Sequence, residues 1–162
     1  MDTRDFTTAI VIDQTPATVF NAINNVRGWW SEEIEGGTEK FNDEFFYHYE
    51  DVHRCQMKII ESIPNKKIVW LVLDNYFKFT NDKNEWIGDN IVFEISEENG
   101  KTQLQMTQLG LNPHDECFEI CRDAWTTYIQ KSLRSLITTG KGMPNGKDKP
   151  QTENEKKLAG NK

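Results

Sequence analysis

Apolar and polar residues alternate with a period of two near the start of the chain. Bulky apolar side chains stand at Phe6, Ile10 and Ile12, with mostly small or polar residues between them. This spacing is typical of a strand with one buried face. The pattern therefore predicts a first strand over residues 6–12.

The same alternation returns from Thr38 to Leu109 in several successive runs. The breaks between runs carry residues that favour tight turns, and they lie at Pro64-Asn65, Asn81-Asp82 and Asn99-Gly100. Short turns of this kind join antiparallel neighbours, whereas parallel strands need long crossover connections. The middle of the chain is therefore predicted to form about six hairpin-linked strands of an antiparallel sheet.

Two other stretches have helical periodicity. After Thr15-Pro16, a good N-cap and first helical residue, apolar side chains recur at helical spacing until a short helix, or two, ends near Trp29-Trp30. A much longer apolar stripe runs from Pro113 to Thr139, with Asn112 as its expected N-cap and Gly140 as its expected stop. The long helix is expected to pack its stripe against the sheet.

These elements predict one α+β domain over residues 1–145. A chain of 162 residues is the usual size of a single domain and can bury a core without disulfides. Residues 146–162 are polar, with Leu158 as their only large apolar residue. Such a segment cannot bury enough surface to offset its ordering entropy, so we expect a disordered tail.

Charge and cysteine content restrict the possible partners and the compartment. A net charge of −7 and a pI of about 5.0 disfavour binding to nucleic acid or to an anionic membrane. No signal peptide and no apolar run of membrane-spanning length is visible. Three cysteines without framework spacing indicate free thiols, and we expect a cytoplasmic protein.

The order of elements resembles the helix-grip fold of START-like and pollen-allergen-like proteins (SRPBCC), in which a sheet curls around one long helix and often leaves a cavity. Several short sequences, spread over residues 6–145, resemble the bacterial branch of the family of homologues of the activator of the heat-shock-protein-90 ATPase (AHSA-like). They are Arg27-Gly28-Trp29-Trp30, Ile68-Val69-Trp70, Glu85-Trp86-Ile87-Gly88, Phe93-Glu94-Ile95, Gly100-Lys101-Thr102, Ala124-Trp125 and Ile137-Thr138-Thr139-Gly140-Lys141-Gly142. The resemblance implies a chaperone as one candidate partner.

Strand parity and the helical stripe together predict the wall of such a cavity. The predicted lining is apolar and aromatic, as in most small-molecule sites, and consists of Trp29, Trp30, Phe45, Tyr47, Met57, Trp70, Phe93, Met106, Trp125 and Tyr128. The alternative is that these side chains fill a solid core, because large aromatic residues dominate cores.

A second group of residues has the donor atoms that zinc prefers. His53 and Cys55 share one face of a predicted strand, and His114, Cys117 and Cys121 share one face of the predicted helix. No CxxC motif accompanies them, so buried, unreactive cysteines are the alternative, and no metal or cofactor is expected. No catalytic motif is present, and Asn99-Gly100-Lys101-Thr102 is interpreted as a hairpin turn.

Three functions remain as hypotheses. The first is binding of a small apolar or aromatic molecule between sheet and helix. The second is an interaction protein that uses its apolar and acidic surface to contact a chaperone or another partner, with an exposed patch expected around Trp29, Trp30 and Trp86. The third is an enzyme, either one that works in the cavity or a zinc or thiol protein. The oligomeric state is left open.

Overall fold

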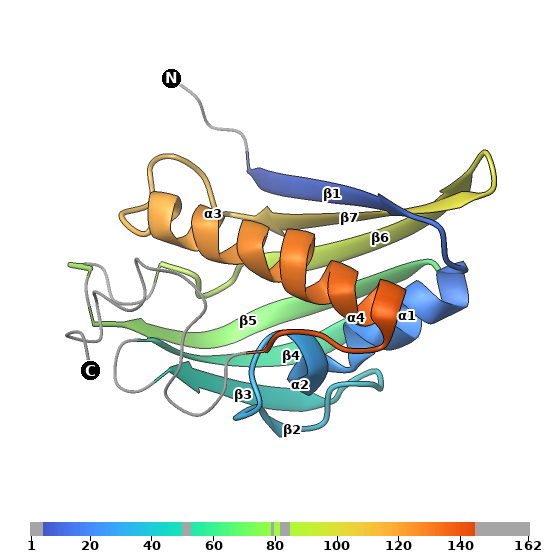
Figure 1. Ribbon diagram of the computed structural model, residues 1–162. Helices are drawn as coiled ribbons and strands as arrows, with labels where there is room; N and C mark the ends of the chain where they lie inside the picture. Colours follow the sequence, from blue (N-terminus) through green and yellow to red (C-terminus); the bar gives the residue numbers. More distant parts are fainter. Residues whose placement is uncertain (1–4, 50–52, 79, 82–84, 145–162) are drawn as a thin grey trace.

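A seven-stranded antiparallel sheet forms one layer of the molecule, in the order β1-β7-β6-β5-β4-β3-β2 (Figure 1). The computed structural model describes residues 5–49, 53–78, 80–81 and 85–144. The strands are β1 (Phe6–Ile12), β2 (Glu35–Gly36), β3 (Glu44–Tyr49), β4 (His53–Ile63), β5 (Lys67–Phe77), β6 (Asn90–Glu98) and β7 (Lys101–Leu109). The predicted antiparallel sheet is confirmed, and β1 has the bounds that its alternation predicts.

The helices of the described ranges all lie on one face of this sheet (Figure 1). Two short helices, α1 (Pro16–Asn24) and α2 (Val26–Trp29), follow β1. The last helix is a continuous run of α3 (Phe118–Thr127), a π-helical segment η1 (Tyr128–Leu133) and α4 (Arg134–Thr139). It crosses the sheet diagonally; α4 lies beside α1, and η1 lies beside α2 (Figure 1). Among the helices of the described ranges, none combines the length and apolar character of a membrane span.

The turn and cap chemistry explains most element boundaries. The Thr15 side chain accepts a hydrogen bond from the backbone N–H of Thr18 at 3.1 Å, which caps α1 as predicted. Asn65 and Asn99 have positive φ angles of 65° and 53° in the two hairpin turns. The third predicted turn falls partly on Asp82, outside the described residues, as does the predicted tail over residues 146–162.

The long helix begins later than its sequence pattern predicts, which corrects the expected start at Pro113. Residues 113–117 form turns, and the Asn112 side chain accepts a bond from the backbone N–H of His114. The Asn-Pro pair is as typical of a turn as of a helix start. The carboxylate of Glu85 accepts bonds from the backbone N–H groups of Glu116 and Cys117 at 2.6 and 3.0 Å. Glu85, which is distant in the sequence, therefore holds the two residues that directly precede the helix start at Phe118.

The π-helical segment in mid-helix has no counterpart in the predicted stripe. Ser132 in this segment is fully buried, and its hydroxyl donates to the carbonyl of Trp29 at 2.7 Å. The same oxygen accepts a bond from the backbone N–H of Met143 at 2.9 Å. One side chain thus ties the helix to α2 and to the segment that follows α4. That segment starts at Gly140, whose φ of 82° confirms it as the predicted helix stop.

Candidate functional site

The ten residues predicted to line a cavity all lie on the inner side of the molecule, between sheet and helix. Each is between 0% and 3% exposed. The strands contribute them at alternating positions, as in the register pairs Phe45 with Met57 and Phe93 with Met106. The sequence therefore predicts correctly which face these side chains occupy. Their contact with a ligand stays a prediction.

All five tryptophans join this inner region, and we call Trp29, Trp30, Trp70, Trp86 and Trp125 the tryptophan cluster. Trp30 connects its members: it stacks on Tyr47 with ring centroids 4.3 Å apart and lies 5.1 Å from Trp125. Trp125 in turn stacks on Trp86 at 6.0 Å. Trp29, Trp30 and Trp86 are buried, so the exposed patch expected around them is wrong. They face the core because each packs against other rings there.

A chain of polar groups enters the cluster from β7. The indole Nε1–H of Trp125 donates to the Gln108 side-chain oxygen at 2.8 Å, and the Gln108 amide donates to the Asp89 carboxyl at 2.9 Å. Burial is the main cause that raises the pKa of Asp89 to about 7; the bond from Gln108 opposes this rise, and the nearby carboxylates of Asp115, Asp5 and Glu85 add to it. Asp89 is therefore a carboxyl that can hold a proton near neutral pH.

A second polar pair lies at the other side of the cluster, on β4 and β5. His53 Nε2 is 2.9 Å from the Asn75 side-chain oxygen. Burial lowers the pKa of His53 to about 4, although the bond to Asn75 favours the charged form. The ring packs on Phe77 at 4.3 Å and edge-on against Trp86 at 4.8 Å. His53 is therefore a neutral imidazole within an aromatic surrounding.

The tryptophans differ in how their indole N–H groups are satisfied. Trp29 donates to the carbonyl of Ile23 at 3.1 Å, and Trp125 donates to Gln108. The buried Nε1–H groups of Trp70 and Trp86 have no acceptor among the described residues. A buried donor without an acceptor costs about 1–3 kcal/mol. Two such donors in one cluster indicate places where an acceptor atom would be stabilising.

The residues considered as zinc ligands do not come together. His53 bonds to Asn75, His114 lies on an exposed turn, and the three cysteines are buried free thiols. Burial, and to a lesser extent Asp74, raises the pKa of the Cys55 thiol, so it does not ionise readily. Within the ranges the structure covers, no three His, Cys, Asp or Glu side chains are placed to hold a metal ion.

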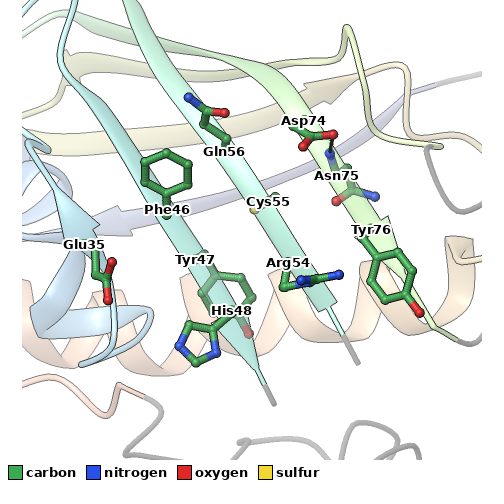
Figure 2. Close-up of a pocket in the computed structure, with 10 residues that line it drawn as sticks. All are labelled: Glu35, Phe46, Tyr47, His48, Arg54, Cys55, Gln56, Asp74, Asn75 and Tyr76. Carbon is green, nitrogen blue, oxygen red and sulfur yellow. Dashed lines mark hydrogen bonds between the residues drawn. The ribbon is translucent and has the colours of Figure 1, made fainter. Parts of the chain in front are cut away.

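The opposite face of the sheet carries a shallow groove that we call the outer groove. Its volume is about 380 Å³, and its lining is Glu35, Phe46, Tyr47, His48, Arg54, Cys55, Gln56, Asp74, Asn75 and Tyr76. Figure 2 shows Phe46, Arg54 and Tyr76 projecting from β3, β4 and β5 on one side of these strands. The Arg54 guanidinium lies 4.8 Å from the Tyr76 ring, and Phe46 is 49% exposed. Within the described part of the chain, the Phe46 and Arg54 side chains are thus exposed in this groove.

The sequence patterns did not predict the polar residues of the inner region. Gln108 occupies the inward parity of β7 in line with Leu104 and Met106, and this polar residue at an apolar position was the available signal. Asn75 was harder to find, because a bulge between Gln56 and Met57 shifts the parity of β5 against β4. Asp89 precedes β6 and follows no periodic pattern.

The family is shown by the comparison of the sequence with family models. The model described as activator of Hsp90 ATPase homolog 1-like protein matches residues 13–138. The chain belongs to this family. The resemblance drawn from the tryptophan-bearing sequences is thereby confirmed, and the fold described above is the helix-grip fold that it implies. No curated protein matches the sequence significantly.

Solved structures of bacterial proteins share the fold of this family member. An Aha1 dimer from Colwellia psychrerythraea is 20% identical, with a TM-score of 0.69 over 86% of this chain and 99% of its own. The protein SSP2350 from Staphylococcus saprophyticus is 17% identical, with a TM-score of 0.63 over 86% of this chain and 96% of its own. The protein MLL2253 from Mesorhizobium loti is 14% identical, with a TM-score of 0.64 over 82% and 96%. Identities this low establish the fold alone.

Proposed function

We propose that this protein binds a small apolar or aromatic molecule between the sheet and the long helix, against the tryptophan cluster. The observation that carries the proposal is the π-helical segment Tyr128–Leu133, which lies where the helix faces the cluster. π-helical turns are rare and occur frequently at functional sites. Tyr128, its first residue, lies 6.4 Å from Trp30 and 6.2 Å from Trp125 between ring centroids.

The chemistry of the inner region supports this role. Small-molecule sites are mostly apolar and contain a few well-placed polar groups. The tryptophan cluster supplies the apolar surface, and the His53–Asn75 and Gln108–Asp89 pairs supply polar groups at two sides of it. The ten residues predicted from the sequence as cavity lining are the ones proposed to contact the ligand.

The proposal is tested by native mass spectrometry of protein purified from its own host, together with thermal shifts against neutral ring compounds such as indane and naphthalene. We expect a retained small-molecule mass, and a rise of the unfolding midpoint by about 3 °C or more at saturating ligand. Absence of both a retained mass and any shift across such a series would contradict it.

A matched variant separates the inner region from the outer groove. Phe46→Ser removes the exposed ring of the outer groove and leaves the inner side chains of β3 in place. Ligand binding that is unchanged by this substitution locates the site on the inner side. Binding that disappears would assign the ligand to the outer groove and contradict the proposal.

The second candidate function is contact with a chaperone. Two observations favour it: the family is named for activation of the Hsp90 ATPase, and the outer groove presents Phe46 beside Arg54 and Tyr76 on the sheet face opposite the long helix. Aromatic and arginine side chains dominate the binding energy of many protein interfaces. The outer groove, rather than the buried tryptophans, is therefore the surface assigned to a partner.

This second function is tested by the ATP hydrolysis rate of an Hsp90-type chaperone with and without the protein. We expect stimulation that is lost in Phe46→Ser and kept in Ile63→Ser, an exposed residue at the end of β4 outside the groove. An unchanged hydrolysis rate with the native protein would rule out this function for that chaperone.

A further inference from the structure

Trp86 presents a hydrogen-bond donor from a firmly held position. It lies in a turn over residues 85–88, and the turn is fixed to β5 by backbone bonds from Gly88 N–H to the Val72 carbonyl and from Val72 N–H to the Asp89 carbonyl. The Trp86 side chain is 3% exposed, and its Nε1–H has no acceptor in the described part of the chain. A buried donor that is held in place but unpaired is suited to bind an acceptor atom of a ligand.

The surroundings of Trp86 accommodate a polar atom better than those of Trp70. Trp86 packs against three rings: His53 at 4.8 Å, Phe77 at 5.4 Å and Trp125 at 6.0 Å between centroids. One of these neighbours, His53, is itself polar and is paired with Asn75, so polar groups are already present beside Trp86. Trp70, the other indole without an acceptor, lies among Trp29, Trp30, Phe45 and Phe93. None of these four neighbouring side chains carries a hydrogen-bond acceptor atom, whereas the His53 ring beside Trp86 carries polar nitrogens.

The charges of the inner region disfavour an ionised ligand of either sign. None of the lysines and arginines in the described ranges is buried, so an anionic group would find no cation there. The raised pKa values of Asp89 and Cys55 show that this environment disfavours negative charge, and the lowered pKa of His53 shows that it disfavours positive charge. A neutral molecule enters without an unpaired charge.

These observations lead to a ligand class. Resting on the proposed function, we infer that the inner region takes a neutral, flat ring compound that carries a carbonyl or ether oxygen, and that Trp86 donates its Nε1–H to this oxygen. The aromatic walls contact the faces of the ring system, and the oxygen lies at the Trp86 end of the cluster. Trp86 thereby selects oxygen-bearing ring compounds over hydrocarbons of the same shape.

Three probes of one ring skeleton test this assignment: indane, 1-indanone and indane-1-carboxylate. Their dissociation constants are measured by NMR titration with the full-length protein, following the indole ¹H–¹⁵N signals. We expect 1-indanone to bind about three- to tenfold more tightly than indane, as one hydrogen bond to a buried donor implies, and the carboxylate to bind more weakly than either. The indole signal of Trp86 should move downfield with 1-indanone and not with indane.

Substitutions assign the effect to one indole. Trp86→Phe keeps a ring but removes the donor, so the ratio of the dissociation constants of indane and 1-indanone should fall to about one, whatever the change in indane affinity itself. Trp70→Phe removes the other unpaired donor and should keep the preference. The indole signals of the native protein give the same answer without any variant, in case a substitution prevents folding.

The possible results distinguish the role of Trp86 from the proposed function. If indane and 1-indanone bind equally to the native protein, the role of Trp86 is overturned while the proposed function stands. A downfield shift of Trp70 instead of Trp86, or tighter binding of the carboxylate, also overturns it. If none of the three probes binds, the proposed function fails for ring compounds of this size, and the inference that depends on it fails too.

Discussion

Gln108 links three segments of the inner region. Its side chain is fully buried on β7 and bonds both to the indole of Trp125 on α3 and to the carboxyl of Asp89 before β6. A neutral amide can donate to one partner and accept from the other at the same time. Gln108 therefore satisfies two buried polar groups that come from different elements.

Replacement of Gln108 by leucine is expected to lower the free energy of unfolding by about 2–4 kcal/mol, because it leaves the Trp125 indole and Asp89 without this partner. Chemical denaturation measures the loss. Gln105→Leu is the matched control: it lies on the outward face of the same strand, and its amide donates to the exposed Thr7 hydroxyl. A loss in Gln105→Leu as large as that in Gln108→Leu would show that burial of the amide is not the cause.

The carboxyl of Asp89 should make stability depend on pH. Its pKa is about 7 in the folded protein and 3.8 in the unfolded chain, so the folded state holds the proton more tightly. The contribution of the Asp89 carboxyl to the free energy of unfolding is therefore fully present below about pH 4, and it is lost as the pH rises through about 7. Asp89→Asn keeps an acceptor for Gln108 and removes the charge.

We expect Asp89→Asn to be more stable than the native protein by about 1–3 kcal/mol at about pH 8, and to show a smaller fall in stability between about pH 4 and 7. Denaturation curves at several pH values measure both effects. Asp13→Asn, at an exposed position, serves as the control and should leave the pH profile unchanged. An Asp89→Asn profile parallel to that of the native protein would contradict the assignment.

At the scale of elements, the long helix is held in place by its π-helical segment. Ser132 in that segment bonds to the Trp29 carbonyl of α2 and to the backbone N–H of Met143 beyond α4. Gln130 donates from the same segment to the Ala9 carbonyl of β1 at 2.9 Å. The π-helical segment therefore makes contacts with elements on both sides of the helix.

Ser132→Ala should cost about 1–2.5 kcal/mol of unfolding free energy, because the buried Trp29 carbonyl and the partly buried Met143 N–H lose their partner. Ser135→Ala is the matched control on the same helix, where the hydroxyl donates to the exposed Lys141 carbonyl, and it should cost clearly less. Urea denaturation compares the two. Equal losses would indicate that the contact of Ser132 with α2 does not anchor the helix.

At the scale of the whole molecule, the tryptophan cluster joins the two layers. Its rings come from α2, the sheet, the turn after β5 and α3, and all are buried. Sheet and helix should therefore unfold together. We expect the unfolding curve followed by tryptophan fluorescence to coincide with the curve followed by far-ultraviolet circular dichroism. Two separate transitions would show that the cluster loosens before the sheet or helices melt.

Local patterns in the sequence determined much of this fold. The alternation over Phe6–Ile12, the Thr15 cap and the turn residues at Asn65 and Asn99 depend on neighbours within a few positions, and each is found as predicted. The apolar parity also placed the aromatic side chains on the inner face, because side chains of a strand alternate strictly between its two faces. The family and its fold followed from short sequence matches.

Tertiary structure alone decided the helix start, the π-helical segment and the polar pairs. Glu85, about thirty residues earlier in the chain, accepts the backbone N–H groups of Glu116 and Cys117, the two residues that directly precede the helix start at Phe118. Gln108 meets Asp89 and Trp125, and His53 meets Asn75, only after strand pairing with its bulges sets the register. Sequence periodicity reports which face a residue occupies, but not which distant residue lies opposite, because that depends on the packing of the complete chain.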